Sequence, residues 1–187
     1  MSRRVALLQV DSTIGDLAGN SRRIEALSKI AAQNGANVAI TTELAICGYP
    51  PRDLLLQPDF VKMSFQRARN LDVEIPLLVG TPTPPEEDRQ LPSNSVVRAG
   101  PVAAMSNAEQ NNQVITKKQL LPSYDVFDET RYFTPAKDSA FCQDIGELNL
   151  GVTICEDAWQ AAGLTPSTYG NDPIENLAEM ARQGISL

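Results

Sequence analysis

The sequence contains no histidine. Catalytic centres that depend on an imidazole, such as Ser-His-Asp triads and Cys-His pairs, are therefore excluded within this chain, as are zinc sites with histidine ligands. Any nucleophilic chemistry carried by these residues must use a base that is not imidazole.

Cysteines and long apolar runs are also scarce. The cysteines are Cys47, Cys142 and Cys155, without CxxC spacing, which argues against a disulfide framework and a Cys-rich metal site. The apolar run at residues 5–10 is too short for a signal peptide or a membrane span, and no later run approaches the ~18 residues that a span needs. We expect a cytoplasmic protein without a bound metal or a membrane partner.

The composition is that of a globular protein with excess negative charge. Its 187 residues allow one domain, or one domain plus a fragment, and hydrophobic residues make up 42%, close to a soluble average. The formal net charge of −7 disfavours binding to nucleic acid, because a phosphate backbone attracts excess positive charge. We therefore expect no nucleic-acid partner.

The order of apolar runs predicts an α/β fold. A strand at residues 5–10, a helix beginning at Asn20 or Ser21 and ending near Asn34, and a strand at residues 37–42 form a βαβ unit,. Further elements continue the same domain. We predict strands at residues 75–80, 95–99, 102–105, 114–121 and 148–155, helices at 58–70 and 173–183, and a Pro-rich surface loop at 81–89,.

Residues 185–187 resemble the start of another buried strand. A crossover helix needs a returning strand to complete it. We therefore expect the domain to continue past Leu187, so that residues 1–187 are incomplete at the C-terminal side.

Reactive side chains lie at or near the carboxyl ends of three of the predicted strands, and binding sites in α/β folds gather beyond such ends. They are Glu43, Lys118 and Cys155. A cysteine thiol is mostly protonated at pH 7, so a catalytic cysteine needs a base or a nearby cation. Glu43 can be that base if burial raises its pKa. Lys118 can favour the thiolate and stabilise an oxyanion.

Each of these residues also has a structural interpretation. A cysteine at a strand end is often a small buried hydrophobe, Glu43 could be a surface cap, and Lys118 could be a solvated strand residue. Cys47 is a rival nucleophile in the loop after Glu43, although it is not presented at a strand end. Cys142 is better explained by packing.

Three segments resemble those of a known family. Residues 42–55 (TELAICGYPPRDLL), 118–133 (KQLLPSYDVFDETRYF) and 151–159 (GVTICEDAW) resemble the general-base, lysine and nucleophile segments of the nitrilase, or carbon–nitrogen hydrolase, superfamily. The GYPP-x-DLL ending is similar to the form found in glutaminase domains of glutamine-dependent NAD+ synthetases. Gln9, residues 15–20 and Asn94-Ser95 also fit. The resemblance implies an α/β, nitrilase-like α-β-β-α sandwich.

The resemblance also implies a mechanism. Cys155 would attack the side-chain amide of glutamine while Glu43 takes its proton, and Lys118 with the backbone N–H of Glu156 would stabilise the oxyanion. A thioester on Cys155 would then be hydrolysed to glutamate. Tyr124 matches a glutamine-contacting tyrosine of the family. Further residues would line the pocket or shape its mouth: Tyr49, Phe127 and Glu129.

The partners implied by the resemblance lie outside residues 1–187. Ammonia would pass to a synthetase domain that uses ATP and Mg to convert deamido-NAD+ to NAD+, and no GxxxxGK[ST] motif for ATP occurs in this sequence,. We expect the parent protein to be a homo-oligomer, and residues 1–187 alone to have weak activity or none. The alternatives are a stand-alone amidase or nitrilase of the same superfamily, and an inactive fragment that only mediates assembly.

Overall fold

The computed structural model describes residues 3–100, 114–137, 142–145, 148–160, 163 and 169–182. Its centre is a mixed sheet in which five strands follow one another in sequence order. They are β1 (Val5–Leu8), β2 (Val38–Thr41), β3 (Leu77–Thr83), β4 (Ser93–Ala99) and β5 (Val114–Lys117).

Strand direction decides which side chains meet at each edge of this sheet. β1, β2 and β3 are parallel, β4 is antiparallel to β3, and β5 is antiparallel to β4. The carboxyl ends of β2, β3 and β5 therefore point the same way as the amino end of β4. Residues that follow β2 or β5, or that begin β4, share one edge of the sheet.

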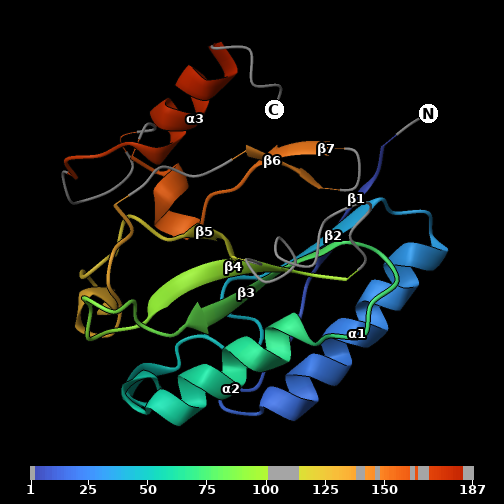
Figure 1. Cartoon of the computed structure of the whole chain (residues 1–187), viewed down its shortest axis with the longest axis horizontal. Coiled ribbons are helices and arrows are strands. Elements are labelled where there is room, and N and C mark those ends of the chain that lie inside the picture. Colours follow the sequence, from blue (N-terminus) through green and yellow to red (C-terminus); the bar gives the residue numbers. More distant parts are fainter. Residues whose placement is uncertain are drawn as a thin grey trace.

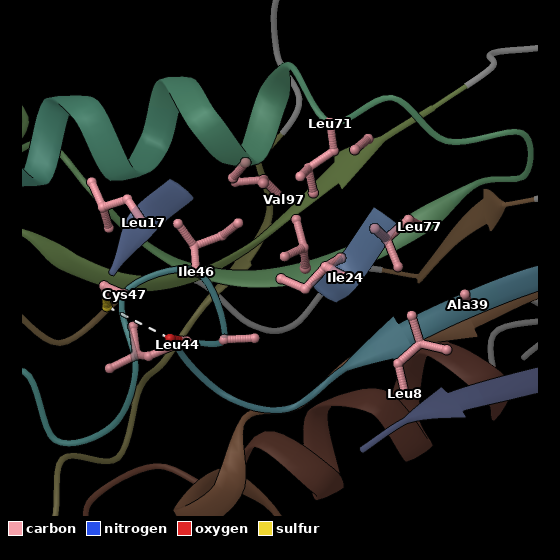
Figure 2. Packing of buried hydrophobic residues seen from close by; sticks show 14 of the residues in the cluster. Leu8, Leu17, Ile24, Ala39, Leu44, Ile46, Cys47, Leu71, Leu77 and Val97 are labelled. Carbon is pink, nitrogen blue, oxygen red and sulfur yellow. Dashed lines mark hydrogen bonds between the residues drawn. The ribbon is translucent and has the colours of Figure 1, made fainter. Parts of the chain in front are cut away.

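Two helices cover one face of the sheet, α1 (Leu17–Gln33) and α2 (Pro58–Arg69) (Figure 1). Each buries residues at helical spacing, as Val61, Ser64 and Ala68 of α2 illustrate,. The Asp16 carboxylate starts α1 by accepting the Gly19 N–H at 2.8 Å,. Figure 2 shows the core between the helices and the sheet, with members including Leu8, Leu17, Ile24, Ala39, Leu44, Ile46, Cys47, Leu71, Leu77 and Val97.

A smaller ribbon covers the other face. It consists of β6 (Cys142–Ile145) and β7 (Leu148–Gly151), which are antiparallel. Its Ile145 packs with buried residues of the large sheet, Val38, Leu78 and Ile115. Figure 1 shows α3 (Pro173–Arg182) on the side of the large sheet opposite to α1 and α2. The layers confirm the expected α-β-β-α arrangement.

Several predicted elements differ from the structure in their bounds or their burial; the strand expected at 114–121, for example, ends at Lys117. β1 is an edge strand and only partly buried, with Val5 and Leu7 41% and 70% exposed. α1 begins at Leu17 because Asp16 caps it. β3 continues to Thr83, since residues 81–83 pair with residues 93–95 of β4, so the Pro-rich loop begins later than predicted.

The end of the chain also departs from the prediction. The strand expected at 148–155 ends at Gly151, and Cys155 instead begins the 3₁₀ helix η4 (Cys155–Ala158). β6 was not predicted. The strand expected at 102–105 and the strand start expected at 185–187 lie outside the described residues.

Candidate active site

Lys118 lies between two carboxylates at the shared edge of the sheet. It follows β5 directly, Glu43 follows β2, and Glu129 begins the 3₁₀ helix η3 (Glu129–Arg131). Lys118 Nζ donates to Glu43 Oε1 at 2.8 Å and to Glu129 Oε1 at 2.9 Å. The structure thus joins two residues that the sequence placed after separate strands with a third that was expected only to line a pocket.

Burial makes the charges of this cluster strongly interdependent. The Lys118 side chain is fully buried. Burial alone would lower the pKa of Lys118, but the charges of Glu43 and Glu129, and hydrogen bonds to both, raise it above its usual value,. Burial also raises the pKa of Glu129, although Lys118 opposes this shift. Lys118 is therefore held as a cation by its two partners.

Asn94 contributes a second donor to Glu43. Its Nδ2 donates to Glu43 Oε1 at 2.7 Å, and its carbonyl accepts the Lys118 backbone N–H at 2.8 Å. Asn94 lies near the amino end of β4, which explains how it reaches this edge. The hydrogen bonds from Asn94 and Lys118 both end on Glu43 Oε1, so the carboxylate is oriented through one of its oxygens.

The backbone of Glu43 rests directly on β3 at Gly80. A Cβ atom at Gly80 would lie 2.5 Å from Leu44 N and 2.7 Å from Thr42 O, closer than such atoms approach one another. Leu44 itself has a φ of +51°, in the left-handed region that glycine favours. Only a glycine at position 80 lets this turn lie against β3 and aim Glu43 at Lys118.

We therefore expect Gly80→Ala to displace the turn that carries Glu43. Activity should fall by about 100-fold, the order of loss that a ~1 Å misplacement causes, and overpacking should lower the free energy of unfolding by about 1–3 kcal/mol. Turnover and urea unfolding measure the two effects. Gly35→Ala is the control. An added Cβ at Gly35 meets only an ordinary contact with Arg4, so the φ of +75° there makes alanine costly to stability but the turn that carries Glu43 is not displaced and activity should be kept,. Equal activity of the two variants would contradict this role of Gly80.

Cys155 is exposed at the beginning of η4, with a φ of +49°. Its thiol is nevertheless partly desolvated, and this burial, followed by the negative charge of Glu43, raises its pKa to about 11. Lys118 acts in the opposite direction and does not outweigh them. Lys118 therefore does not create a resting thiolate, as the sequence had suggested, and the thiol is protonated at neutral pH.

This raised pKa predicts how Cys155 reacts with a simple alkylating agent. Iodoacetamide should modify Cys155 slowly at pH 7, and the rate should rise with pH toward a midpoint of about 11, because only the thiolate reacts. Peptide mass spectrometry over a pH series measures it. A midpoint below pH 7 would show a resting thiolate instead.

Cys47 differs from Cys155 in its accessibility. It is fully buried in the core, and its thiol lies 3.6 Å from the Leu44 carbonyl (Figure 2). Burial raises its pKa to about 12. Both thiols are protonated at neutral pH, but the Cys47 thiol is also enclosed in the core, where a substrate does not reach it,. The geometry therefore disfavours Cys47 as the rival nucleophile. The side chain of Cys142 lies outside the described part of the structure.

Glu156 is buried next to Cys155 and bound by two tyrosines. Tyr124 OH donates to its Oε2 at 2.8 Å, and Tyr169 OH donates to its Oε1 at 3.0 Å. The hydrogen bond to Glu156 raises the pKa of Tyr124. From the sequence, Tyr124 was expected to contact glutamine, and only the backbone N–H of Glu156 was given a role. The structure adds the Glu156 carboxylate, which Tyr124 and Tyr169 hold in place.

The remaining predicted residues border a cavity of about 240 Å³. Tyr49, Phe127 and Glu129 all line it, and Tyr49 OH donates to Glu129 Oε1 at 2.9 Å. Phe127 packs edge-to-face on Tyr124, with ring centroids 5.7 Å apart. This cavity therefore adjoins the carboxylate–lysine cluster, while Cys155 is not among its lining residues.

Sequence reasoning assigned no role to three polar residues of this region. Asn94 was noted only as fitting the family resemblance, and Asp157 only as part of the segment around Cys155; a polar residue within a strand and its position two residues after Cys155 were the available signals. Tyr169 carries no local signal, because its contact depends on how a loop folds. Among the residues that the structure describes, no cluster of three or more acidic or cysteine side chains could hold a metal ion, and no helix is long and apolar enough to cross a membrane.

Comparison with known proteins gives a consistent result. The model of the family "Carbon-nitrogen hydrolase" matches residues 4–168. The chain is 34% identical, over 98% of its length, to a glutamine-dependent NAD(+) synthetase of Synechocystis sp., of which it spans about a third (32%).

Solved structures add support for the fold. The chain aligns with a glutamine-dependent NAD+ synthetase from Acinetobacter baumannii with a TM-score of 0.72 and 27% identity, covering 95% of this chain and 30% of that one. An amidase variant from Nesterenkonia sp. AN1, in which acrylamide has added to the active-site cysteine, aligns with a TM-score of 0.65 at 21% identity, covering 84% of this chain and 59% of that one. From the family match and these similarities, the chain belongs to the carbon–nitrogen hydrolase family.

Proposed function

We propose that this chain is the glutamine-hydrolysing domain of a glutamine-dependent NAD+ synthetase. The observation that carries the proposal is the buried contact between Lys118 and Glu43, with Cys155 close enough for both charges to act on its thiol. The similarity to NAD+ synthetases over nearly the whole chain supports glutamine as the substrate.

In the proposed mechanism, Glu43 takes the Cys155 proton as the sulfur attacks the amide carbon of glutamine. Lys118 and Asn94 both bind Glu43 Oε1, so Oε2 is the oxygen that accepts this proton. The C–S bond forms as the carbonyl becomes an oxyanion. Because the thiol is protonated at neutral pH, the reaction needs a base at this step.

The second half of the proposed reaction returns the proton. The oxyanion is stabilised by Lys118 and the Glu156 backbone N–H, and loss of one such donor costs about 3–4 kcal/mol of barrier. As the C–N bond breaks, Glu43 gives its proton to the departing ammonia and a thioester remains on Cys155. Glu43 then deprotonates a water that releases glutamate.

We propose that Glu156 and the residues around it recognise glutamine. The Glu156 carboxylate, oriented by Tyr124 and Tyr169, offers a buried negative charge for the α-ammonium group of an amino acid. Tyr49 and Phe127 would shape the mouth of the adjoining cavity. An amide without an ammonium group would lack this contact and should be a poor substrate.

We also propose the wider setting that the resemblance implies. Residues 1–187 would belong to a glutaminase domain in a cytoplasmic homo-oligomer, and its ammonia would pass to a synthetase domain that binds ATP and Mg and amidates deamido-NAD+. The similarity of this chain to about a third of a curated synthetase supports this setting.

Release of ammonia and glutamate tests the proposal. The full-length protein should hydrolyse glutamine far faster than asparagine or propionamide, and Cys155→Ala should abolish the reaction. Preference for propionamide would favour a stand-alone amidase. Absence of hydrolysis of all three amides by a folded protein would favour the inactive alternative.

A further inference from the structure

The Asp157 carboxylate accepts three backbone hydrogen bonds. Its Oδ1 accepts the N–H groups of Gln119 at 3.0 Å and Leu120 at 2.8 Å, and its Oδ2 accepts the N–H of Ile154 at 3.2 Å. The side chain is buried, since the residue is only 1% exposed. It is not one of the groups that the mechanism above uses.

These hydrogen bonds join the two segments that must meet for catalysis. Gln119 and Leu120 directly follow Lys118, and Ile154 directly precedes Cys155. Asp157 and Gln119 are 38 residues apart in the sequence. We propose that Asp157 is a positioning residue that fixes the Cys155 thiol relative to the Lys118 ammonium group. This inference rests on the proposed function of Cys155 as the nucleophile.

The local backbone explains why such a residue is needed. Cys155 has a φ of +49°, an unfavourable conformation for a residue with a side chain,. The η4 helix that it begins has four residues and cannot maintain that conformation through its own hydrogen bonds alone,. Asp157 also donates its backbone N–H to the Ile154 carbonyl at 3.1 Å. The turn is therefore held from both sides of Cys155 by one residue.

Only an ionised carboxylate satisfies all three N–H groups, because it accepts hydrogen bonds at both oxygens and donates none. An asparagine would keep one accepting oxygen and direct its NH₂ group at a backbone N–H. Asp157→Asn therefore changes the hydrogen bonding while it preserves the size of the side chain. It should loosen the Cys155 turn without creating a cavity.

The protonation of Asp157 gives a second way to test its positioning role, through the pH dependence of stability and of Cys155 reactivity. Burial raises the pKa of Asp157 to about 6, while the backbone hydrogen bonds and the positive charge of Lys118 act to lower it. Because this pKa is higher than in the unfolded chain, the folded state binds the proton more tightly, and stability falls as pH rises from about 4 to 6. Positioning of Cys155 should improve over the same range, so the two properties move in opposite directions.

The test is alkylation of Cys155 in the full-length protein by 6-diazo-5-oxonorleucine, an electrophilic analogue of glutamine. Peptide mass spectrometry at several probe concentrations separates the maximal alkylation rate from the affinity for the probe. Asp157→Asn should lower the maximal rate by about 100-fold, the order expected for a small misplacement, and leave the affinity nearly unchanged. The wild-type rate should also show an acidic midpoint near 6 that the variant lacks.

The matched control is Asp16→Asn, which makes the same change at a carboxylate that also accepts a backbone N–H, that of Gly19, at the start of α1. Cys155 of this variant should be alkylated at the wild-type maximal rate. A wild-type rate and pH profile in Asp157→Asn would overturn the inference alone. Failure of the wild type to react at Cys155 would overturn the proposed function, and this inference with it.

A measurement on the wild type covers the case in which Asp157→Asn does not fold. The amide resonances of Gln119, Leu120 and Ile154 should titrate together with a midpoint near 6, in step with the alkylation rate of Cys155. Amides that titrate while the alkylation rate of Cys155 stays constant would overturn the role of Asp157.

Discussion

Lys118→Met is expected to abolish glutamine hydrolysis and to lower the free energy of unfolding by about 3–5 kcal/mol, the usual cost of removing one partner from a buried ion pair. Lys118 is fully buried and bound to Glu43 and Glu129. Its loss leaves two carboxylates facing each other without a cation, and the oxyanion without a charged donor. Ammonia release and urea unfolding measure the two effects.

The neighbouring Lys117 supplies the control for this variant. Lys117 forms a more exposed ion pair with Glu86, and such pairs contribute about 0–1 kcal/mol. Lys117→Met should therefore leave activity intact and stability nearly so. Adding Glu129→Gln to Lys118→Met should recover part of the stability without recovering activity. Substantial hydrolysis by Lys118→Met would show that Lys118 is not needed for catalysis.

Glu43→Gln is expected to lower turnover by about 10²–10⁴-fold, the contribution typical of a general base. The substituted amide can still accept the hydrogen bonds from Asn94 and Lys118 at its oxygen, but it cannot take the proton of a thiol. The substrate affinity should change far less than the turnover. Steady-state kinetics with glutamine separate the two quantities.

Glu25→Gln is the control for the Glu43 substitution, because Glu25 lies on α1, away from Lys118, and its carboxylate accepts the Asp72 backbone N–H. It should behave as the wild type. Near-normal turnover of Glu43→Gln, in a protein with unchanged unfolding, would show that another group acts as the base.

The layers of the fold could be predicted from the sequence because burial leaves a clear pattern. Val38 and Ala39 are both fully buried, and such uninterrupted apolar runs are typical of strands covered on both faces. Val5 and Leu7 have the same pattern, but their exposure depends on their place at the edge of the sheet. Strand order is a tertiary property, so no local pattern could reveal it.

The positions of Glu43 and Lys118 followed from the same logic, since both lie close to the carboxyl ends of strands that share an edge of the sheet. The contact of Glu129 with Lys118 did not follow, because Glu129 begins a short 3₁₀ helix in a segment whose path is set by tertiary packing. The role proposed for Asp157 was equally hidden. Its hydrogen bonds reach across 37 and 38 residues of sequence.

The most direct test of the proposed mechanism is to trap its covalent intermediate. The full-length protein is mixed with glutamine and quenched in acid within the first turnovers, and its peptides are analysed by mass spectrometry. We predict a glutamyl thioester on Cys155, and none on any peptide of Cys155→Ala. A glutamyl group on Cys47 or Cys142, or continued ammonia release by Cys155→Ala, would contradict the account.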